Sequence, residues 1–358
     1  MNMQAEKAPQ QKASPNYAGI IIGLIVIALL AYTTNWLSHN SAKIVGKDFS
    51  KALEYPLWAA LLGLIANAVV TSTGTKEMIK PAIRTELFLK TGLVLMGASV
   101  NLGVIVSIGS KGIIQGLIMI TCVFFFTWWL CDRFGISESM KAVMATAISI
   151  CGVSAAIAAA GSVLAKKEEL AYVTALVIFT ALPLMVLMPW LANVLGLAPE
   201  VAGAWFGGNI DTSAAVVGAG TIHGEATAKI AAVIKMTQNA LIGFVAFALA
   251  FYFTTVVEKG GQKPSASVIW ERFPKFVLGF IFTSIVASMG FFDKGDLTAI
   301  KNLQQWAFNL AFVCIGLELT FVDFKHLGGK PTYVFLIATV FNTLLALLVS
   351  YILFGVLA

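Results

Sequence analysis

Long runs without a charged side chain divide this chain into segments of about membrane-spanning length. Ten runs contain no Asp, Glu, Lys or Arg, and an eleventh is interrupted only by Asp211. A crossing needs about 17–25 apolar residues, and backbone groups in lipid must find hydrogen-bond partners within the structure. We therefore expect an all-α polytopic membrane protein of about eleven transmembrane helices. The runs are 13–42, 55–75, 91–110, 112–131, 142–165, 170–199, 201–224, 236–257, 276–292, 302–317 and 331–358.

The composition excludes an ordinary soluble domain. Hydrophobic residues make up 58% of the chain and charged residues 12%, whereas soluble domains have about 45–50% and about 25%. The net charge of +6 comes from basic residues scattered over short loops, so it does not indicate a nucleic-acid partner. Residues 1–16 are polar and predict a disordered tail, and residues 17–358 predict a single transmembrane domain in contact with membrane lipid.

The basic loops predict the orientation of the chain. Loops 76–90 and 259–275 contain the most Lys and Arg, and with eleven crossings both lie on the side of the N-terminus. Because basic loops tend to stay in the cytoplasm, we expect a cytoplasmic N-terminus and an external C-terminus. The contrast is modest, because Lys43, Lys47 and Lys51 fall on the other side.

A short repeat links two distant parts of the chain. Residues 94–111 align with residues 313–330, inside larger copies around 84–131 and 302–350. Seven crossings separate the copies, so we expect an inverted repeat of the kind found in secondary transporters. If one of the segments 142–165 and 201–224 is re-entrant, the copies are parallel instead. The matched pairs are Val94 with Val313, Gly97 with Gly316, Gly109 with Gly328, and Lys111 with Lys330.

Two of the apolar runs have the pattern of a helix that stops and restarts inside the membrane. Gly152 precedes Ser154, and Gly207-Gly208 precede a polar run from Asp211 to Ser213. Glycine relieves the backbone at a break, and Ser, Thr or Asp caps a new helix. The free N–H groups and partial positive charge of such a start form an anion site. Close packing of small residues between helices is the alternative explanation.

Ionisable residues within the apolar runs suggest how a site would be completed. Asp211 is costly at membrane depth, so we expect it to face a cavity and to pair with Lys235. Gln238 and Asn239 follow Lys235 by three and four residues and share its helix face. This predicts a cation and two amides aimed at one oxyanion, although Lys235 could instead extend to the interface. Glu318 either carries a coupling proton or lies near the surface.

No enzyme motif is present in the sequence. Patterns such as GxSxG, HExxH and the P-loop are absent. The four cysteines lie singly in apolar runs, and the three histidines form no ligand cluster. We therefore expect neither an enzyme nor a bound metal or cofactor.

The same residues resemble the YeiH-like family of bacterial inner-membrane proteins, which are often described as sulfate exporters. The resemblance covers most of the chain after the tail. Where the family motif reads Ser-Ile-His-Glu with a later Gln, this chain has Asn209-Ile-Asp-Thr212 and Ala215, and Gln238 stands where many members have Arg. The resemblance implies a multi-pass inner-membrane carrier that is related in architecture to cation/proton antiporters and bile-acid symporters. By analogy with those architectures we expect a homodimer. It rests most specifically on residues 93–100, 150–155, 205–220 and 234–236.

The leading functional hypothesis is a secondary transporter that exports a small anion such as sulfate or an organic sulfonate. An ion gradient of protons or sodium would drive alternating access, with Asp211 or Glu318 carrying the coupling ion. One alternative is a cation/proton antiporter that uses Asp211 and Lys235. Another is a membrane scaffold in which the polar residues are dispensable. The predicted binding residues are Gly152, Ser154, Asn209, Asp211, Thr212, Ser213, Lys235, Gln238 and Asn239.

Overall fold

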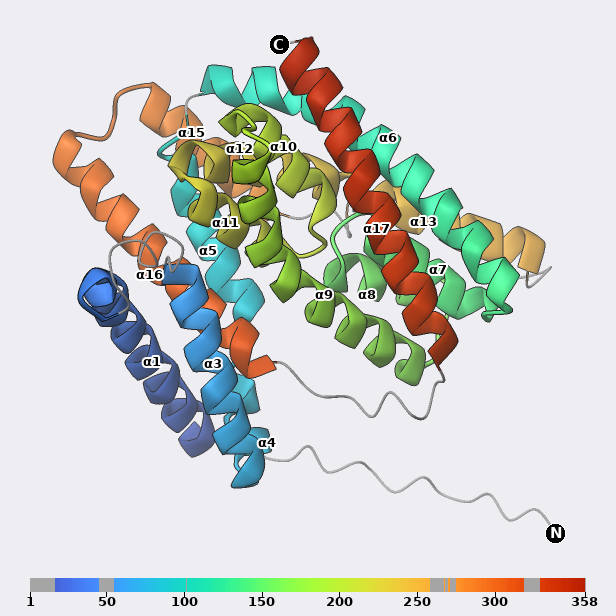
Figure 1. Ribbon diagram of the computed structural model, residues 1–358. Helices are drawn as coiled ribbons and strands as arrows, with labels where there is room; N and C mark the ends of the chain where they lie inside the picture. The colour runs from blue at the N-terminus through green and yellow to red at the C-terminus, as the bar shows by residue number, and fades with distance from the viewer. Residues whose placement is uncertain are drawn as a thin grey trace.

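The computed structural model shows an all-α membrane fold (Figure 1), as the sequence predicts. It describes residues 17–44, 55–100, 102–257, 267, 270, 275–318 and 329–357, so the predicted tail and most of loop 259–275 lie outside the described residues. The exact number of crossings stays a prediction. Within the described part, six helices are long and apolar enough to cross a membrane, namely Tyr17–Ser41, Tyr55–Ser72, Ile105–Phe134, Lys167–Val194, Glu225–Val257 and Gly329–Val356.

One set of helices, the α16 group, lies on the left in Figure 1. Helix α16 packs against both α3 and α5, and α15 packs against α5. Apolar side chains of this group, among them Leu93, Phe308 and Phe312, are fully buried between the helices. The group comprises α1 (Tyr17–Ile44), α3 (Tyr55–Ser72), α4 (Lys76–Ile79), the 3-10 turn η1 (Lys80–Ala82), α5 (Thr85–Gly97), α15 (Phe276–Ser288) and α16 (Lys294–Glu318).

The remaining helices form the α17 group. In Figure 1, α6 and α17 cross the right side, and α10, α11 and α12 lie between them and the α16 group. Tyr172, Trp205 and Phe206 are fully buried in its core. Its members are α6 (Leu102–Phe134), α7 (Glu138–Ser149), α8 (Val153–Ser162), α9 (Lys167–Val194), α10 (Pro199–Asn209), α11 (Ser213–His223), α12 (Glu225–Ala240), α13 (Ile242–Tyr252) with the π-helical turn Phe253–Val257, and α17 (Gly329–Tyr351) with the π-helical turn Ile352–Val356.

One predicted boundary is wrong. The charge at Lys111 suggested two spans meeting there, but α6 continues through it from Leu102 to Phe134, and the break lies between Gly97 and Leu102. The Lys111 ammonium donates to the Leu357 carbonyl at 3.0 Å and lies over the ring of Phe354. A lysine whose long side chain reaches a partner does not have to end a membrane helix.

The two repeat copies lie against each other. Helix α5 packs on α16 and α6 packs on α17, and α6 and α17 run in opposite directions (Figure 1). Asn101 of the first copy, and Thr320 and Gly328 of the second, lie outside the described residues. The inverted repeat therefore stays a prediction.

Glycines allow the closest approaches between helices. A Cβ atom on Gly63 of α3 would lie 2.3 Å from the Val313 carbonyl oxygen of α16, and one on Gly316 would lie 2.4 Å from a carbonyl oxygen of α3. In α10, Gly203 and Gly207 lie similarly close to α12. Small residues four apart permit this packing in membranes. Close helix packing by small residues, the alternative explanation for segment 201–224, is thus present in α10. The same segment also contains the interruption described below.

Substitution at the α3–α16 contact should destabilise the protein. We expect Gly63→Ala and Gly316→Ala each to cost about 1–3 kcal/mol, because an added methyl group has no room. Gly109→Ala is the matched control, since no atom lies within 4 Å of a Cβ there and alanine favours a helix. Thermal unfolding in detergent measures the difference. Equal melting temperatures for all three variants would contradict the close α3–α16 packing.

Candidate functional site at two interrupted helices

The first interruption separates α7 from α8. Helix α7 ends at Ser149, the Gly152 amide closes its last turn by donating to the Ala147 carbonyl at 2.9 Å, and α8 begins at Val153. Gly152 has a φ of +61°, a conformation that glycine adopts at little cost. The sequence suggested Ser154 as the cap of this helix, but Gly152 takes that position and Ser154 lies in the first turn.

The second interruption separates α10 from α11. Helix α10 ends at Asn209 and α11 begins at Ser213. Thr212 caps α11, because its hydroxyl oxygen accepts from the Ala215 amide at 3.2 Å. Both discontinuous helices predicted from the sequence are therefore confirmed.

The two interruptions meet. A Cβ atom on Gly152 would lie 3.3 Å from the Asp211 Cβ and 3.2 Å from the Asp211 carbonyl oxygen. Two helices from different parts of the sequence thus break at the same place. A glycine is needed at 152 both for its backbone conformation and for this contact.

Side chains of α12 bond the carbonyl end of α7. The Lys235 ammonium donates to the Ile150 carbonyl, and the Gln238 amide donates to the Ser149 carbonyl at 3.0 Å. The last carbonyls of a helix have no partner within it, and a cation there also offsets the partial negative charge of the helix end. Lys235 and Gln238 therefore stabilise the interruption.

Asn342 of α17 forms hydrogen bonds to the ends of both α7 and α10. Its amide donates to the Ile148 carbonyl at 3.2 Å and to the Asn209 carbonyl at 3.0 Å. The Asn209 side chain points to other helices, since its amide donates to the Met188 sulfur and its oxygen accepts from the Thr343 hydroxyl. Asn209, predicted as a ligand, thus packs against α9 and α17.

Lys235 and Asp211 form no direct ion pair in the part of the chain that the structure describes, although their charges interact at longer range. The Lys235 ammonium donates to the Ile150 carbonyl and to the Gln238 side-chain oxygen at 2.9 Å. Lys235 is 2% exposed, so it does not extend to the interface. Lys235 and Gln238 bond the end of α7 while Asn239 bonds Ser213, and a shared anion for the three stays a prediction.

Asp211 lies buried where the interruptions meet. It is 1% exposed, and neither of its carboxylate oxygens has a hydrogen-bond partner among the described residues. The starts of α8 and α11 lie next to it and favour a negative charge. An unpaired buried carboxylate is nevertheless costly, so a proton or a cation would stabilise it here.

The amino ends of α8 and α11 line two adjoining cavities of about 560 and 570 Å³. Thr212 lines the first and Asn239 the second. The Asn239 amide donates to the Ser213 hydroxyl at 3.1 Å, while its side-chain oxygen has no partner among the described residues. Four predicted binding residues therefore lie around connected space. Both cavities share Glu86, Leu89, Cys151, Val153, Ser154 and Ser213.

Of the charged residues around these cavities, sequence reasoning identified Glu318 and missed the others. Glu86 of α5 accepts from the Ser154 hydroxyl at 3.0 Å and pairs with Lys90 at 2.6 Å. Lys80 lines the first cavity with Glu318, and Lys275 lines the second. The spacing of Glu86 and Lys90 marks them as a helix pair, but nothing local connects them with Ser154, which is 68 residues away.

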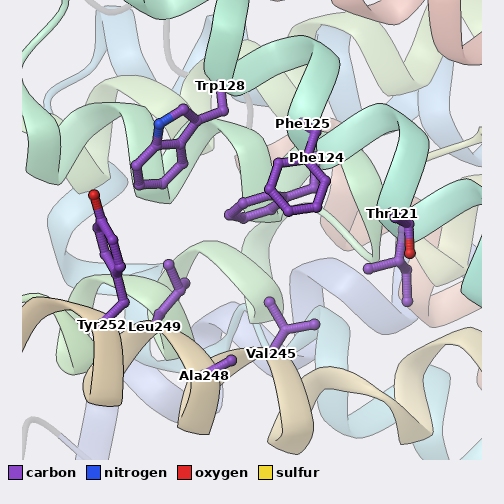
Figure 2. Close-up of a pocket in the computed structure, with 9 residues that line it drawn as sticks. Thr121, Phe124, Phe125, Trp128, Val245, Ala248, Leu249 and Tyr252 are labelled. Atoms are coloured by element: carbon purple, nitrogen blue, oxygen red, sulfur yellow. The ribbon is translucent and has the colours of Figure 1, made fainter.

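A separate hollow of about 440 Å³ lies between α6 and α13. Figure 2 shows Phe124, Phe125 and Trp128 of α6 across from Val245 and its neighbours on α13. Its lining is aromatic or aliphatic apart from two hydroxyl groups, so it offers little to bind an ion. Among the described residues no group of three or more His, Cys, Asp and Glu could hold a metal ion. We therefore place the candidate site at the interruptions.

Comparison with known sequences identifies the family. The profile of the family described as "Conserved hypothetical protein 698" matches residues 20–347. The chain belongs to this family. Its relatives are the UPF0324 membrane proteins, so the YeiH-like resemblance and a multi-pass membrane protein are both confirmed.

Three relatives show how far the similarity extends. A UPF0324 membrane protein of Rhodopirellula baltica is 39% identical over 92% of this chain and 62% of its own length. One from Nitratidesulfovibrio vulgaris is 38% identical over 95% of this chain and 60% of its own length. Another from that organism is 30% identical over 86% of both chains. The chain thus spans about 60% of the first two relatives. No solved structure matches.

The role of Lys235 can be tested through stability. We expect Lys235→Ala to lower the melting temperature without any added anion, because losing the partner of a buried carbonyl costs about 1–3 kcal/mol. Lys167→Ala, on an exposed lysine, should have no effect. Thermal unfolding with and without sulfate distinguishes the two roles. An unchanged anion-free melting temperature with loss of the sulfate effect would make Lys235 a ligand instead.

Proposed function

We propose that the protein is a secondary transporter that exports a small anion, such as sulfate or an organic sulfonate, by alternating access. The observation that carries this proposal is that the first turns of α8 and α11 line the same connected cavities. Helix starts offer unpaired N–H groups and a partial positive charge to an anion. Ser154, Thr212 and Ser213 add hydroxyl groups beside them.

The surrounding charges support an anion that enters from the cytoplasm. Lys80, Lys90 and Lys275 line the cavities and raise the local concentration of anions. Lys80 and Lys275 belong to the two loops that the charge bias assigns to the cytoplasm, together with the N-terminus. In this orientation the cavities open to the inside of the bacterial inner membrane, which suits an exporter.

A smaller cavity at the opposite end of the helices supports alternating access. It has a volume of about 280 Å³ and is lined by Ser99, which follows α5, and by Thr221 near the end of α11. There Lys301 of α16 pairs with Glu225 of α12 at 2.9 Å, an exposed ion pair between the two helix groups. Opening this side while the other closes would expose the anion alternately. The opposed directions of α6 and α17 suit the inverted repeat that such motion uses.

Removing one hydroxyl from the site should weaken transport of the anion. We expect Ser213→Ala to raise KM for sulfate or a sulfonate about tenfold, because a hydrogen bond to a charged group contributes about 1.5–3 kcal/mol. Ser162→Ala is the matched control, since Ser162 bonds within α8 and lines neither cavity. Uptake of labelled sulfate and sulfonates into proteoliposomes under an imposed ion gradient measures the effect. Absence of uptake by the parent protein would contradict the proposal.

A second candidate, a cation/proton antiporter, is favoured by Asp211 alone. Both of its oxygens are buried without a partner among the described residues. A carboxylate in this environment can bind a proton or a cation. Lys235 bonds the end of α7, so in this scheme it acts on Asp211 through its charge and not through a direct ion pair. Glu318, which lines the first cavity, remains a candidate for coupling in either scheme.

The antiporter candidate predicts a different response. If it is correct, a sodium or potassium gradient should move protons across proteoliposomes, and Asp211→Asn should abolish this movement because the amide cannot exchange a proton. Added sulfate should have no effect. Glu200→Gln, at an exposed acid, is the control. Proton flux is read from an internal pH indicator after a pH jump, and a parent protein that moves no protons under either gradient excludes this candidate.

A further inference from the structure

We propose that the Glu86 carboxylate occupies the anion subsite at the start of α8, and that a transported dianion replaces it while Glu86 takes up a proton. The inference rests on the proposed anion transport and names its coupling group. In this scheme the Ser154–Glu86 hydrogen bond and the Glu86–Lys90 ion pair break. Glu86 takes up one proton from the bulk aqueous phase, and the anion accepts from Ser154 instead. One proton then accompanies each dianion.

The contact of Glu86 matches the chemistry expected of the transported anion. Its Oε1 accepts from Ser154, which lies in the first turn of α8. An oxyanion is stabilised at this position by the helix dipole and by hydrogen bonds. Glu86 is also 54% exposed on its side chain and lines both cavities, so it has space in which to withdraw.

Asn239 is a second polar group at these cavities, and Glu86 does not bond its side-chain oxygen. Asn239 is 4% exposed and lines the second cavity, and its side-chain oxygen has no partner among the described residues. The two ends of an amide are assigned from their hydrogen bonds. With the amide reversed, Ser213 donates to the Asn239 oxygen, and the NH₂ group becomes a donor without a partner among the described residues. Glu86 therefore fills only part of a site that has a further donor available.

The charges facing Glu86 explain why a proton must accompany a dianion. Three lysines line the two cavities with two glutamates, which leaves a net charge of +1. A dianion would change this to −1, and a proton on Glu86 would restore neutrality. Arg84 lies at the start of α5 but donates to the Pro81 carbonyl. The groups on surrounding elements are Lys80, Lys90, Lys275, Glu318 and Cys151, with Asp211 buried behind Gly152.

The inference predicts a specific pH dependence of binding. If one proton binds with each dianion, the sulfate affinity should fall up to tenfold for each pH unit over the range in which the proton is taken up. Glu86→Gln removes both the competing charge and the proton site. In this variant sulfate should bind with an affinity that hardly changes with pH, and at pH 8 it should bind at least tenfold more tightly than in the parent.

The experiment measures sulfate binding to the purified full chain by calorimetry between pH 5 and pH 8. The variants are Glu86→Gln, Glu318→Gln for the second carboxylate, and Glu168→Gln as a control on an exposed acid of α9. Titration of the parent in buffers of different ionisation enthalpy counts the protons taken up, so this reading does not depend on any variant folding. We expect about one proton for each sulfate in the parent and none in Glu86→Gln, with Glu168→Gln like the parent.

The outcomes separate this inference from the proposed function. If sulfate and a sulfonate fail to bind the parent and Glu86→Gln at every pH, the anion function itself is wrong. If the parent binds and transports sulfate without proton uptake, Glu86 is not exchanged for the anion. If proton uptake persists in Glu86→Gln and disappears in Glu318→Gln, Glu318 is the coupling group and the inference is overturned.

Discussion

The fold depends on how peptide groups are satisfied where two membrane helices break. Broken helices expose carbonyls at one end and N–H groups at the other, and lipid supplies no partners for either. Here the carbonyl ends are bonded by Lys235, Gln238 and Asn342. The N–H ends of α8 and α11 instead face cavities. This asymmetry leaves a positive, hydrogen-bond-donating surface at the centre of the molecule, which is why we favour an anion as the transported species.

Two carboxylates respond to that positive surface in different ways. Asp211 is buried behind Gly152 and has no partner among the described residues, whereas Glu86 reaches the start of α8 from another helix and remains half-exposed. Asp211 resembles a fixed charge or a proton-binding site. Glu86 resembles a carboxylate that occupies an anion site until a ligand displaces it. In the two proposed functions, anion export and cation/proton antiport, a different one of these carboxylates would exchange its partner.

Much of the architecture could be predicted because membrane constraints act locally. Charge-free runs predicted the helical fold, and glycines followed by small polar residues predicted both interruptions. The pattern left Asp211, Thr212 and Ser213 open as the cap of α11, and the structure places Thr212 there. Local reasoning failed at Lys111, which a helix accommodates when its ammonium finds a carbonyl nearby. For Lys235 it indicated the interaction with the charge of Asp211, but not the hydrogen bond to the carbonyl end of α7. The orientation, the repeat and the coupling ion remain predictions.

By itself the sequence determined that this is a helical membrane protein and where two of its helices break, since both follow from the cost of charges and unpaired peptide groups in lipid. Only the tertiary structure decided that the breaks meet, that Lys235 bonds the end of α7, and that Glu86 and Lys275 reach the same space as Ser154 and Asn239. These contacts join residues on separate helices. Their geometry is set by how closely glycine-bearing helix faces pack, which no local pattern records.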